Sequence, residues 1–227
     1  MARLKRLTTP KFWRLKKKKS TWAVAVRPGA HKKFESIPIQ ILLRDVLKIV
    51  ETGKEANLIL QSKQVLVDGK IIKDHAFPVG LMDVLSIPQI KKNFRIVAAK
   101  DGLIPIEIPE TEAKLKLVKI RNKTILRKGK MQINLTGGRN ILTEKKDYST
   151  GDSILIELPE NKILEHFKLD KGSVALITKG PKSGKIVKIE KIKKGEITAD
   201  LDGKETVVER DYLFVVGKNS PAIKVSD

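Results

Sequence analysis

The chain has 227 residues, no cysteine and a formal net charge of +21. Its length suffices for one or two ordinary domains or three small ones, and the absence of cysteine excludes disulfides, thiolate zinc sites, iron–sulfur clusters and cysteine nucleophiles. Because so large a positive charge makes the folded chain repel itself, nucleic acid is the leading class of partner. No apolar run approaches the ~18 residues of a membrane span, and the N-terminus lacks the apolar core of a secretory signal, so we expect a cytoplasmic protein.

Residues 1–35 form a strongly basic N-terminal segment. It holds twelve basic residues against one acid, Glu35, which is about half of the net charge. So dense a charge with little apolar periodicity predicts an arm that does not fold alone and becomes ordered on RNA; the alternative is a nuclear-import or non-specific basic tail. Both tryptophans lie here, and rings among cations stack on bases or pack under arginines. The predicted RNA-binding residues of the arm are Arg3, Lys5, Arg6, Lys11, Trp13, Arg14, Lys16, Lys17, Lys18, Lys19, Trp22, Arg27, Lys32 and Lys33.

Residues 36–88 begin with two helix signals. Ser36-Ile37-Pro38 predicts a helix start, and apolar residues then recur at helical spacing over 39–50. Thr52-Gly53-Lys54-Glu55 has the form of a capping box, in which hydroxyl and carboxylate each satisfy an orphan backbone donor. A second apolar run over 56–60 follows it. The pattern predicts two short helices in succession.

A hairpin signal follows the helices. The strand Val65-Leu66-Val67 runs into Asp68-Gly69-Lys70, a tight turn whose glycine supplies positive φ, and residues 78–87 add a turn and another strand. This helix–helix–hairpin arrangement resembles the S4-type RNA-binding domain, which holds structured RNA against its two helices. The alternative is a half-buried helix pair with lysines on its wet side. The cations predicted to line one RNA-binding surface are Arg44, Lys48, Lys54, Lys63 and Lys70.

Residues 89–168 are the least informative part of the chain. Short alternating runs separated by glycine-containing turns predict several strands in a small barrel or sandwich. A second concentration of cations is either another RNA contact or a solvated strand face, and it comprises Lys119, Arg121, Lys123, Arg127, Lys128 and Lys130.

From residue 169 the pattern sharpens. Two strands flank the glycine-framed basic loop Lys179 to Lys185, an arrangement that resembles the KOW motif of SH3-like barrels. We predict RNA contacts from Lys179, Lys182 and Lys185. A nucleotide-binding loop is excluded, since only three residues separate Gly180 from Gly184 and no hydroxyl residue follows Lys185.

No group of residues in the sequence predicts catalysis or metal binding. The three histidines, at 31, 75 and 166, are far apart and lack partners at metal-binding spacing. Glu107, Glu110 and Glu112 flank Pro109 in an expected loop with nothing to raise a pKa. We therefore expect no catalytic residue, no metal and no cofactor.

Several short matches point to one family. They are Leu4-Lys5-Arg6-Leu7, Pro10-Lys11 with Trp13, Arg27-Pro28, His31-Lys32, Ser36 with Pro38, and Leu43-Arg44. Together they resemble the S4e family of archaeal and eukaryotic small-subunit ribosomal proteins, and the length is similar to that of archaeal members. His31 matches the family's pattern and is the one histidine predicted to bind RNA.

The resemblance implies an α+β, multi-domain chain. The expected parts are a basic RNA-binding arm (1–35), an S4-like α-α-β domain (36–88), a central β-rich domain (89–168), a KOW-containing SH3-like β-barrel (169–216) and a tail (217–227). It implies a structural constituent of the small ribosomal subunit, with ribosomal RNA and neighbouring ribosomal proteins as partners, and no enzyme activity, membrane, small-molecule substrate or homo-oligomer. From the residues alone, an RNA-modifying enzyme and a free transcription or translation factor stay open.

Overall fold

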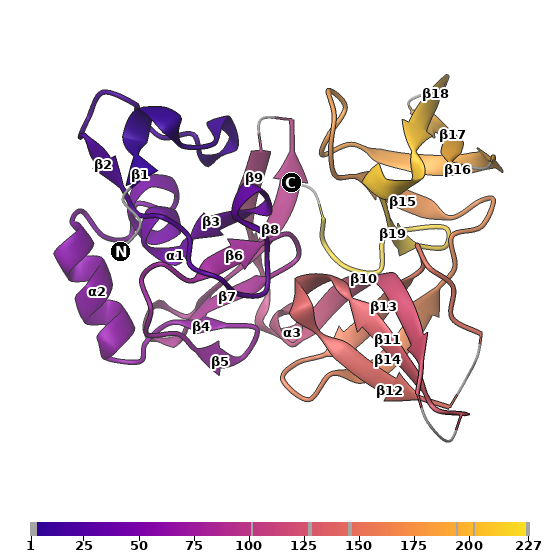
Figure 1. Cartoon of the computed structure of the whole chain (residues 1–227), viewed down its shortest axis with the longest axis horizontal. Coiled ribbons are helices and arrows are strands. Elements are labelled where there is room, and N and C mark those ends of the chain that lie inside the picture. The colour runs from indigo at the N-terminus through magenta and orange to yellow at the C-terminus, as the bar shows by residue number, and fades with distance from the viewer. Residues whose placement is uncertain are drawn as a thin grey trace. The chain divides into compact units, whose positions relative to one another are not determined.

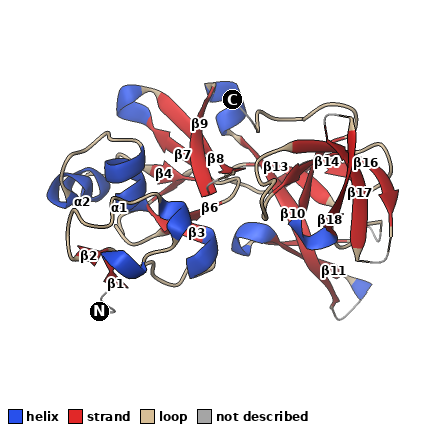
Figure 2. Ribbon diagram, turned by 90° about the horizontal axis from the view of Figure 1, so that it is seen from above, coloured by secondary structure: helices blue, strands red, loops and turns tan. Residues whose placement is uncertain are grey.

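The computed structural model describes residues 4–100, 102–126, 129–144, 147–193, 195–201 and 203–225. The fold mixes helix and strand and consists mostly of sheets, as Figures 1 and 2 show. The chain forms two compact units: residues 1–97 with 101–113, and residues 98–100 with 114–227. Within the described ranges, no helix is long and apolar enough to cross a membrane.

The first unit contains two strand pairs and one larger sheet. The pairs are β1 (Leu4–Lys5) with β2 (Trp22–Ala23) and β3 (Ser36–Pro38) with β6 (Pro78–Gly80). The five-stranded sheet has the order β5 (Lys70–Ile71), β4 (Leu66–Val67), β7 (Val84–Ile87), β8 (Lys92–Ala99) and β9 (Gly102–Ile108). A single cluster of buried apolar side chains draws on the helices, these strands and the N-terminal segment.

The helices of the first unit are short. α1 (Ile39–Ile41) continues into a π-helical turn (Leu42–Val46), α2 spans Gly53–Gln61 and α3 spans Glu110–Ala113. The first helix begins at Ile39, directly after the predicted start signal and with Pro38 in the N-cap position, but Ser36 does not cap it. Ser36–Pro38 form the buried strand β3, and the strand that pairs with it lies about forty residues further along the chain.

The capping box before α2 is confirmed. The hydroxyl oxygen of Thr52 accepts a hydrogen bond from the Glu55 N–H at 3.2 Å, and the Glu55 carboxylate accepts one from the Glu51 N–H at 2.9 Å. The bonds from Glu51 and Thr52 hold the pKa of Glu55 below its ordinary value. The helix therefore begins where the local sequence predicts.

The hairpin is also confirmed, and its sheet extends further than expected. Leu66 pairs with Ile71 and Val67 with Lys70, and the intervening Asp68 and Gly69 have φ of 52° and 75°. Positive φ at both positions is the form of turn that matches strand twist. β8 and β9 then continue the same sheet, so strands expected in a central domain starting at residue 89 belong to the sheet that contains β4 and β7.

The N-terminal segment is part of the first unit's fold. Figures 1 and 2 show β1 and β2 beside α1, and Trp13 and Leu15 belong to the buried apolar cluster. Trp13 has no exposed surface, and its indole Nε1–H donates to the Ser36 carbonyl oxygen at 2.9 Å. The described part of the segment is therefore not separate from the rest of the first unit, as the predicted arm would be, because apolar residues between the cations pack on the core.

The second unit contains two five-stranded antiparallel sheets. One has the order β12 (Asn140–Thr143), β11 (Met131–Leu135), β10 (Leu115–Ile125), β13 (Ser153–Glu157), β14 (Lys162–Phe167). The other has the order β18 (Lys204–Glu209), β17 (Glu196–Leu201), β16 (Ile186–Ile192), β15 (Val174–Ile177), β19 (Leu213–Gly217).

Lys119 on β10 joins the two sheets of the second unit. Its ammonium donates to the carbonyl oxygens of Arg210, Asp211 and Leu213 at 3.2, 3.1 and 2.8 Å. Burial lowers the pKa of Lys119 to about 8; the nearby Asp211 carboxylate opposes this shift and the cationic Arg210 adds to it. The residue therefore ties β10 to the start of β19.

The expected C-terminal tail packs onto the second unit. Ile223 and Val225 are buried, and the Ala222 N–H donates to the Val216 carbonyl at 2.9 Å. The sequence predicted only a tail over 217–227, whereas two of its apolar side chains are buried.

Candidate nucleic-acid interface

Most of the predicted RNA-binding cations lie on the surface. Those that are exposed are Lys5, Lys11, Arg14, Lys16, Lys18, Lys19, Arg27, Lys32, Lys33, Lys48, Lys54, Lys63, Lys70, Lys179, Lys182 and Lys185, and Trp22 is exposed as well. Lys17 and Arg44 are half-buried, and Arg3 lies outside the described residues. Phosphate oxygens attract such cations regardless of nucleotide sequence, so these positions can supply affinity and register.

Two predicted RNA-binding residues of the N-terminal segment are core residues instead. Trp13 has no exposed surface and cannot stack on a base. The Arg6 side chain is 3% exposed, ion-pairs with Asp45 at 3.2 Å and donates from Nε to the Lys16 carbonyl at 2.7 Å. Both predictions are wrong for one reason: the sequence shows the charge of the segment but not which side chains its fold turns inward.

His31 is likewise an internal anchor. Its Nε2 lies 2.9 and 3.0 Å from the two carboxylate oxygens of Asp83, and the two side chains are 8% and 3% exposed. Asp83 also accepts the Gly80 N–H at 2.8 Å. A Cβ at Gly80 would lie 2.3 Å from the imidazole, so only glycine lets the ring approach β6 so closely. The His31 side chain is therefore engaged within the chain, where it fastens the N-terminal segment to the unit.

Two half-buried cations also have partners within the chain. The Lys17 ammonium donates to the carbonyl and hydroxyl oxygens of Thr9 at 2.7 and 2.8 Å. The Arg44 guanidinium donates to Asp45 at 2.7 and 3.0 Å. Asp45 thus holds both Arg6 and Arg44, which reduces the positive charge that this side of the π-helical turn presents to solvent.

The cations that follow the two helices stand on well-defined turns. Lys48 and Lys63 take positive φ, 55° and 59°, directly after the π-helical turn and after α2. Lys54 lies in the first turn of α2 and Lys70 on the edge strand β5. Each of these side chains is exposed, as an RNA-facing surface requires.

The loop between β15 and β16 presents three further lysines. Gly180 and Gly184 have φ of 91° and 87°, and the Gly184 N–H donates to the Ile177 carbonyl at 2.8 Å, which closes the loop. Lys182 donates to the Thr206 hydroxyl at 2.9 Å while it remains exposed. The loop thus presents cations to solvent on a hydrogen-bonded framework.

Sequence reasoning missed one aromatic residue. Phe34 is 75% exposed and lies in a 3₁₀ turn, Lys33–Glu35, directly after two lysines. Among the phenylalanines, tyrosines and tryptophans that the structure describes, only Phe34 and Trp22 are exposed. The signal available in the sequence was its position beside Lys32 and Lys33.

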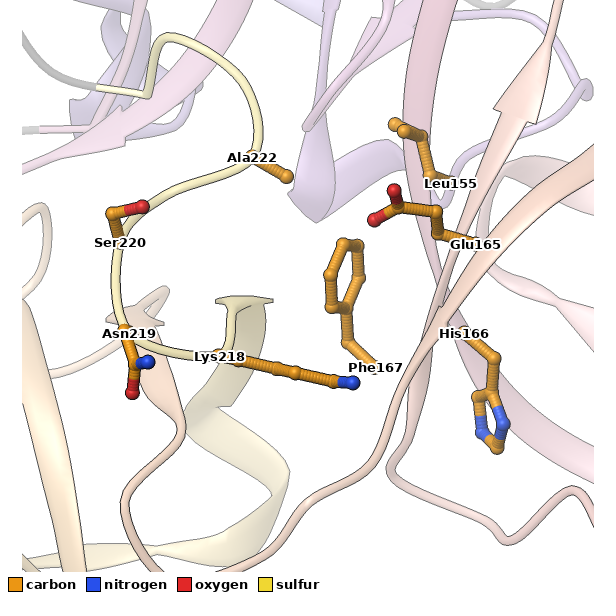
Figure 3. A pocket seen from close by; sticks show the side chains of 8 residues that line it. All are labelled: Leu155, Glu165, His166, Phe167, Lys218, Asn219, Ser220 and Ala222. Atoms are coloured by element: carbon orange, nitrogen blue, oxygen red, sulfur yellow. The ribbon is translucent and has the colours of Figure 1, made fainter.

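The second unit has a cavity of about 660 Å³ beside the C-terminal residues. Figure 3 shows Phe167 of β14 facing a wall formed by residues 218–222, while His166 points away from Ser220. His166 is engaged with Asp152 at 2.8 Å instead. His166 is therefore not placed to act as a general base toward Ser220 in this cavity. Across the described ranges, no cluster of three or more histidine, aspartate or glutamate side chains could hold a metal ion.

Comparison with known proteins identifies the family. The model of the RS4NT domain matches residues 2–34, and that of ribosomal family S4e matches residues 90–163. The chain is 41% identical to the small ribosomal subunit protein eS4 of Archaeoglobus fulgidus, covering 98% of this chain and 96% of that protein. It is 40% identical to the protein of the same name from Methanocella arvoryzae, over 97% and 96%.

A solved structure agrees with this result. The crystal structure of the 30S ribosomal protein S4e from Thermoplasma acidophilum superposes with a TM-score of 0.73 at 28% identity, covering 81% of this chain and 96% of that one. Two full-length relatives at about 40% identity and one fold of the same family leave a single assignment. The chain belongs to the S4e family of ribosomal proteins.

Proposed function

We propose that this chain is a structural constituent of the small ribosomal subunit that binds ribosomal RNA and neighbouring ribosomal proteins and performs no catalytic step. The observation that carries the proposal is the spread of exposed cations over the N-terminal segment, the helix pair, the hairpin and the β15–β16 loop. Membership in the S4e family and the names of its relatives, small-subunit proteins, support it.

Binding would proceed mainly through phosphate charge. Lysines and arginines neutralise phosphates and release condensed counterions, which gives an affinity that falls steeply with salt. Several separate basic elements let one chain contact several RNA segments, so that it would support subunit assembly as well as hold the finished particle.

We also propose that two parts of the chain each form a known RNA-binding module. Residues 36–88 would form an S4-like RNA-binding domain, supported by the succession of α2 and the β4–β5 hairpin with exposed Lys48, Lys54 and Lys63. Residues 169–216 would form an SH3-like barrel with a KOW motif, supported by the antiparallel order of β15 to β19 and by the basic loop between β15 and β16. Residues 89–168 would include the strands of the central β-rich part.

The test is a salt titration of binding to a small-subunit ribosomal RNA fragment. Deleting residues 1–35 is unsuitable, because the deletion removes buried Trp13 and Leu15 from the core and would destabilise the first unit. The better variant replaces the exposed Lys16, Lys18 and Lys19 by glutamine. We expect the slope of log affinity against log salt to become shallower by roughly two to three, since each lost phosphate contact removes about 0.7–0.9.

The matched control makes the same charge change elsewhere. Lys188, Lys191 and Lys193 are exposed on or just after β16 and are not among the predicted contacts. Replacing them by glutamine should change the slope by less than one. Equal effects of the two triple variants, or an affinity that does not depend on salt, would refute the proposed contacts. Small subunits washed at high salt should retain the protein stoichiometrically, whereas a cycling factor would be removed.

A further inference from the structure

We infer that Phe34 is a stacking platform for an unpaired RNA base, with Lys32 and Lys33 holding the adjacent phosphates. The inference rests on the proposed function and adds to it a site, a ligand class and a mode of contact. Phe34 is 75% exposed, against 49% for Trp22, the other exposed aromatic residue. A large apolar ring that gains nothing from the core invites an explanation in terms of a partner.

The backbone that carries Phe34 is fixed on both sides. On one side, His31 is held by Asp83 at 2.9 Å. On the other, Ser36 is fully buried, pairs with Gly80 and donates from its hydroxyl to the Lys32 carbonyl at 2.8 Å. The Glu35 N–H donates to the same carbonyl at 2.9 Å. The 3₁₀ turn is therefore a rigid support, so that little backbone entropy is lost when a ligand stacks on the ring.

The neighbours of the ring fit a nucleotide. The Lys33 ammonium lies 5.9 Å from the centroid of the Phe34 ring, within the range of a cation–π contact. Lys32 is exposed beside it. A base has a π-face for the ring, and its own phosphate and that of the next nucleotide lie on either side for the two lysines, so two successive nucleotides satisfy the whole group. An apolar pocket of a protein would cover the ring but would also have to desolvate the two ammonium groups, which is costly without acidic partners.

This arrangement predicts a preference for single strands. In a duplex, bases are stacked on each other and unavailable to a side chain, whereas loops and bulges offer splayed bases. Phosphate contacts, in contrast, are available in both forms. The contribution of Phe34 should therefore appear only with unpaired RNA, while that of the lysines appears with either.

The experiment uses the full chain and two RNA probes of equal length, a single-stranded oligouridylate containing 4-thiouridine and an RNA duplex. Phe34→Ala should weaken binding of the single strand roughly 5- to 150-fold, the range that alanine substitution at base-stacking aromatics spans. Its slope of log affinity against log salt should stay that of the wild type, because no phosphate contact is lost. Binding of the duplex should change less than 2-fold, by the same reasoning.

Three further variants separate stacking from mere apolar contact. Phe34→Tyr keeps a stacking ring and should bind the single strand like the wild type, whereas Phe34→Leu should resemble Phe34→Ala. Leu142→Ala removes another exposed apolar side chain, 62% exposed on β12, and should have no effect. Photo-crosslinking from 4-thiouridine should map to the peptide that contains Phe34, and Phe34→Ala should abolish that crosslink.

The failures of the two proposals are distinguishable. If the wild type binds neither probe, the proposed RNA-binding function fails. If it binds both with a steep salt dependence but Phe34→Ala is unchanged, or weakens the single strand and duplex equally, the stacking site alone is refuted. Unchanged RNA binding together with poorer incorporation of Phe34→Ala into small subunits would identify a protein contact and would also refute it.

Discussion

Replacing Trp13 by alanine should lower the free energy of unfolding of the first unit far more than replacing Trp22 by alanine. Trp13 is fully buried in the apolar cluster, whereas Trp22 is 49% exposed. Truncation of a buried tryptophan costs about 3–5 kcal/mol through lost burial and the cavity left behind. Loss of the indole N–H also leaves the carbonyl of the buried Ser36 without that donor, for which ~1 kcal/mol or more is typical. We therefore expect about 4–5 kcal/mol for Trp13→Ala.

The loss can be divided between packing and the hydrogen bond. Trp13→Phe keeps much of the apolar volume but removes the donor to Ser36, so it should cost about 1–3 kcal/mol. Trp22→Ala, the control, should stay within about 1 kcal/mol because its ring is half exposed.

The assay is urea denaturation followed by tryptophan fluorescence and far-ultraviolet circular dichroism. Both tryptophans lie in the first unit, so fluorescence reports the unfolding of that unit and not of the second. Each alanine variant leaves one indole as the probe. If Trp13→Ala shifted the urea midpoint no more than Trp22→Ala, the N-terminal segment would not be part of the core. The segment would then be a separate arm, as the sequence predicts.

Three other predictions follow from single contacts. His31→Ala should destabilise the first unit by roughly 1–3 kcal/mol in the same assay, because buried Asp83 loses one of its hydrogen-bond partners, while the half-exposed His75→Ala should be neutral. Thr52→Ala should cost about 1 kcal/mol and Thr52→Ser much less, since serine keeps the cap; equal losses would show that the hydroxyl does not cap α2. For Lys119, whose pKa falls from 10.5 to about 8 on burial, the unfolded chain binds more protons between these values. The stability of the wild type relative to Lys119→Met should therefore rise with pH across this window, by up to about 3 kcal/mol, and a difference that stays flat by calorimetry would contradict the assignment.

Local signals in the sequence predicted local structure well. The capping box before α2 and the turn at Asp68-Gly69 depend on residues within four positions of each other, and both occur as expected. The strand at Ser36–Pro38 was not predicted, because it forms only by pairing with Pro78–Gly80, and no local pattern shows that pairing. Prediction of the candidate site is limited in the same way. The partner of His31, Asp83, lies 52 residues away in the sequence, so no local pattern shows that the two side chains meet.

The charge density of the N-terminal segment did not show which of its side chains turn inward. The N-terminal segment carries apolar side chains, Phe12, Trp13 and Leu15 among them, at spacings that match neither helix nor strand. Their burial depends on contacts remote in the chain: a Cβ at Gly102 would lie 2.5 Å from Phe12, so β9 and the turn at Phe12 touch only because residue 102 is glycine. Because these apolar residues follow neither helical nor strand spacing, the sequence did not show that the N-terminal segment contributes to the core.

Three acids of the first unit each hold one basic group of the N-terminal segment. Asp45 holds Arg6, Asp74 holds Arg27 at 3.1 Å and Asp83 holds His31. The Arg6–Asp45 ion pair is largely buried, so salt screens it weakly, whereas the Arg27–Asp74 pair is exposed and contributes little. The attachment of the segment therefore depends on Trp13, on the buried Arg6–Asp45 pair and on the buried hydrogen bond between His31 and Asp83, contacts that persist at salt concentrations where phosphate contacts weaken. A salt titration of RNA affinity should consequently measure the exposed lysines of a folded segment and not the unfolding of that segment.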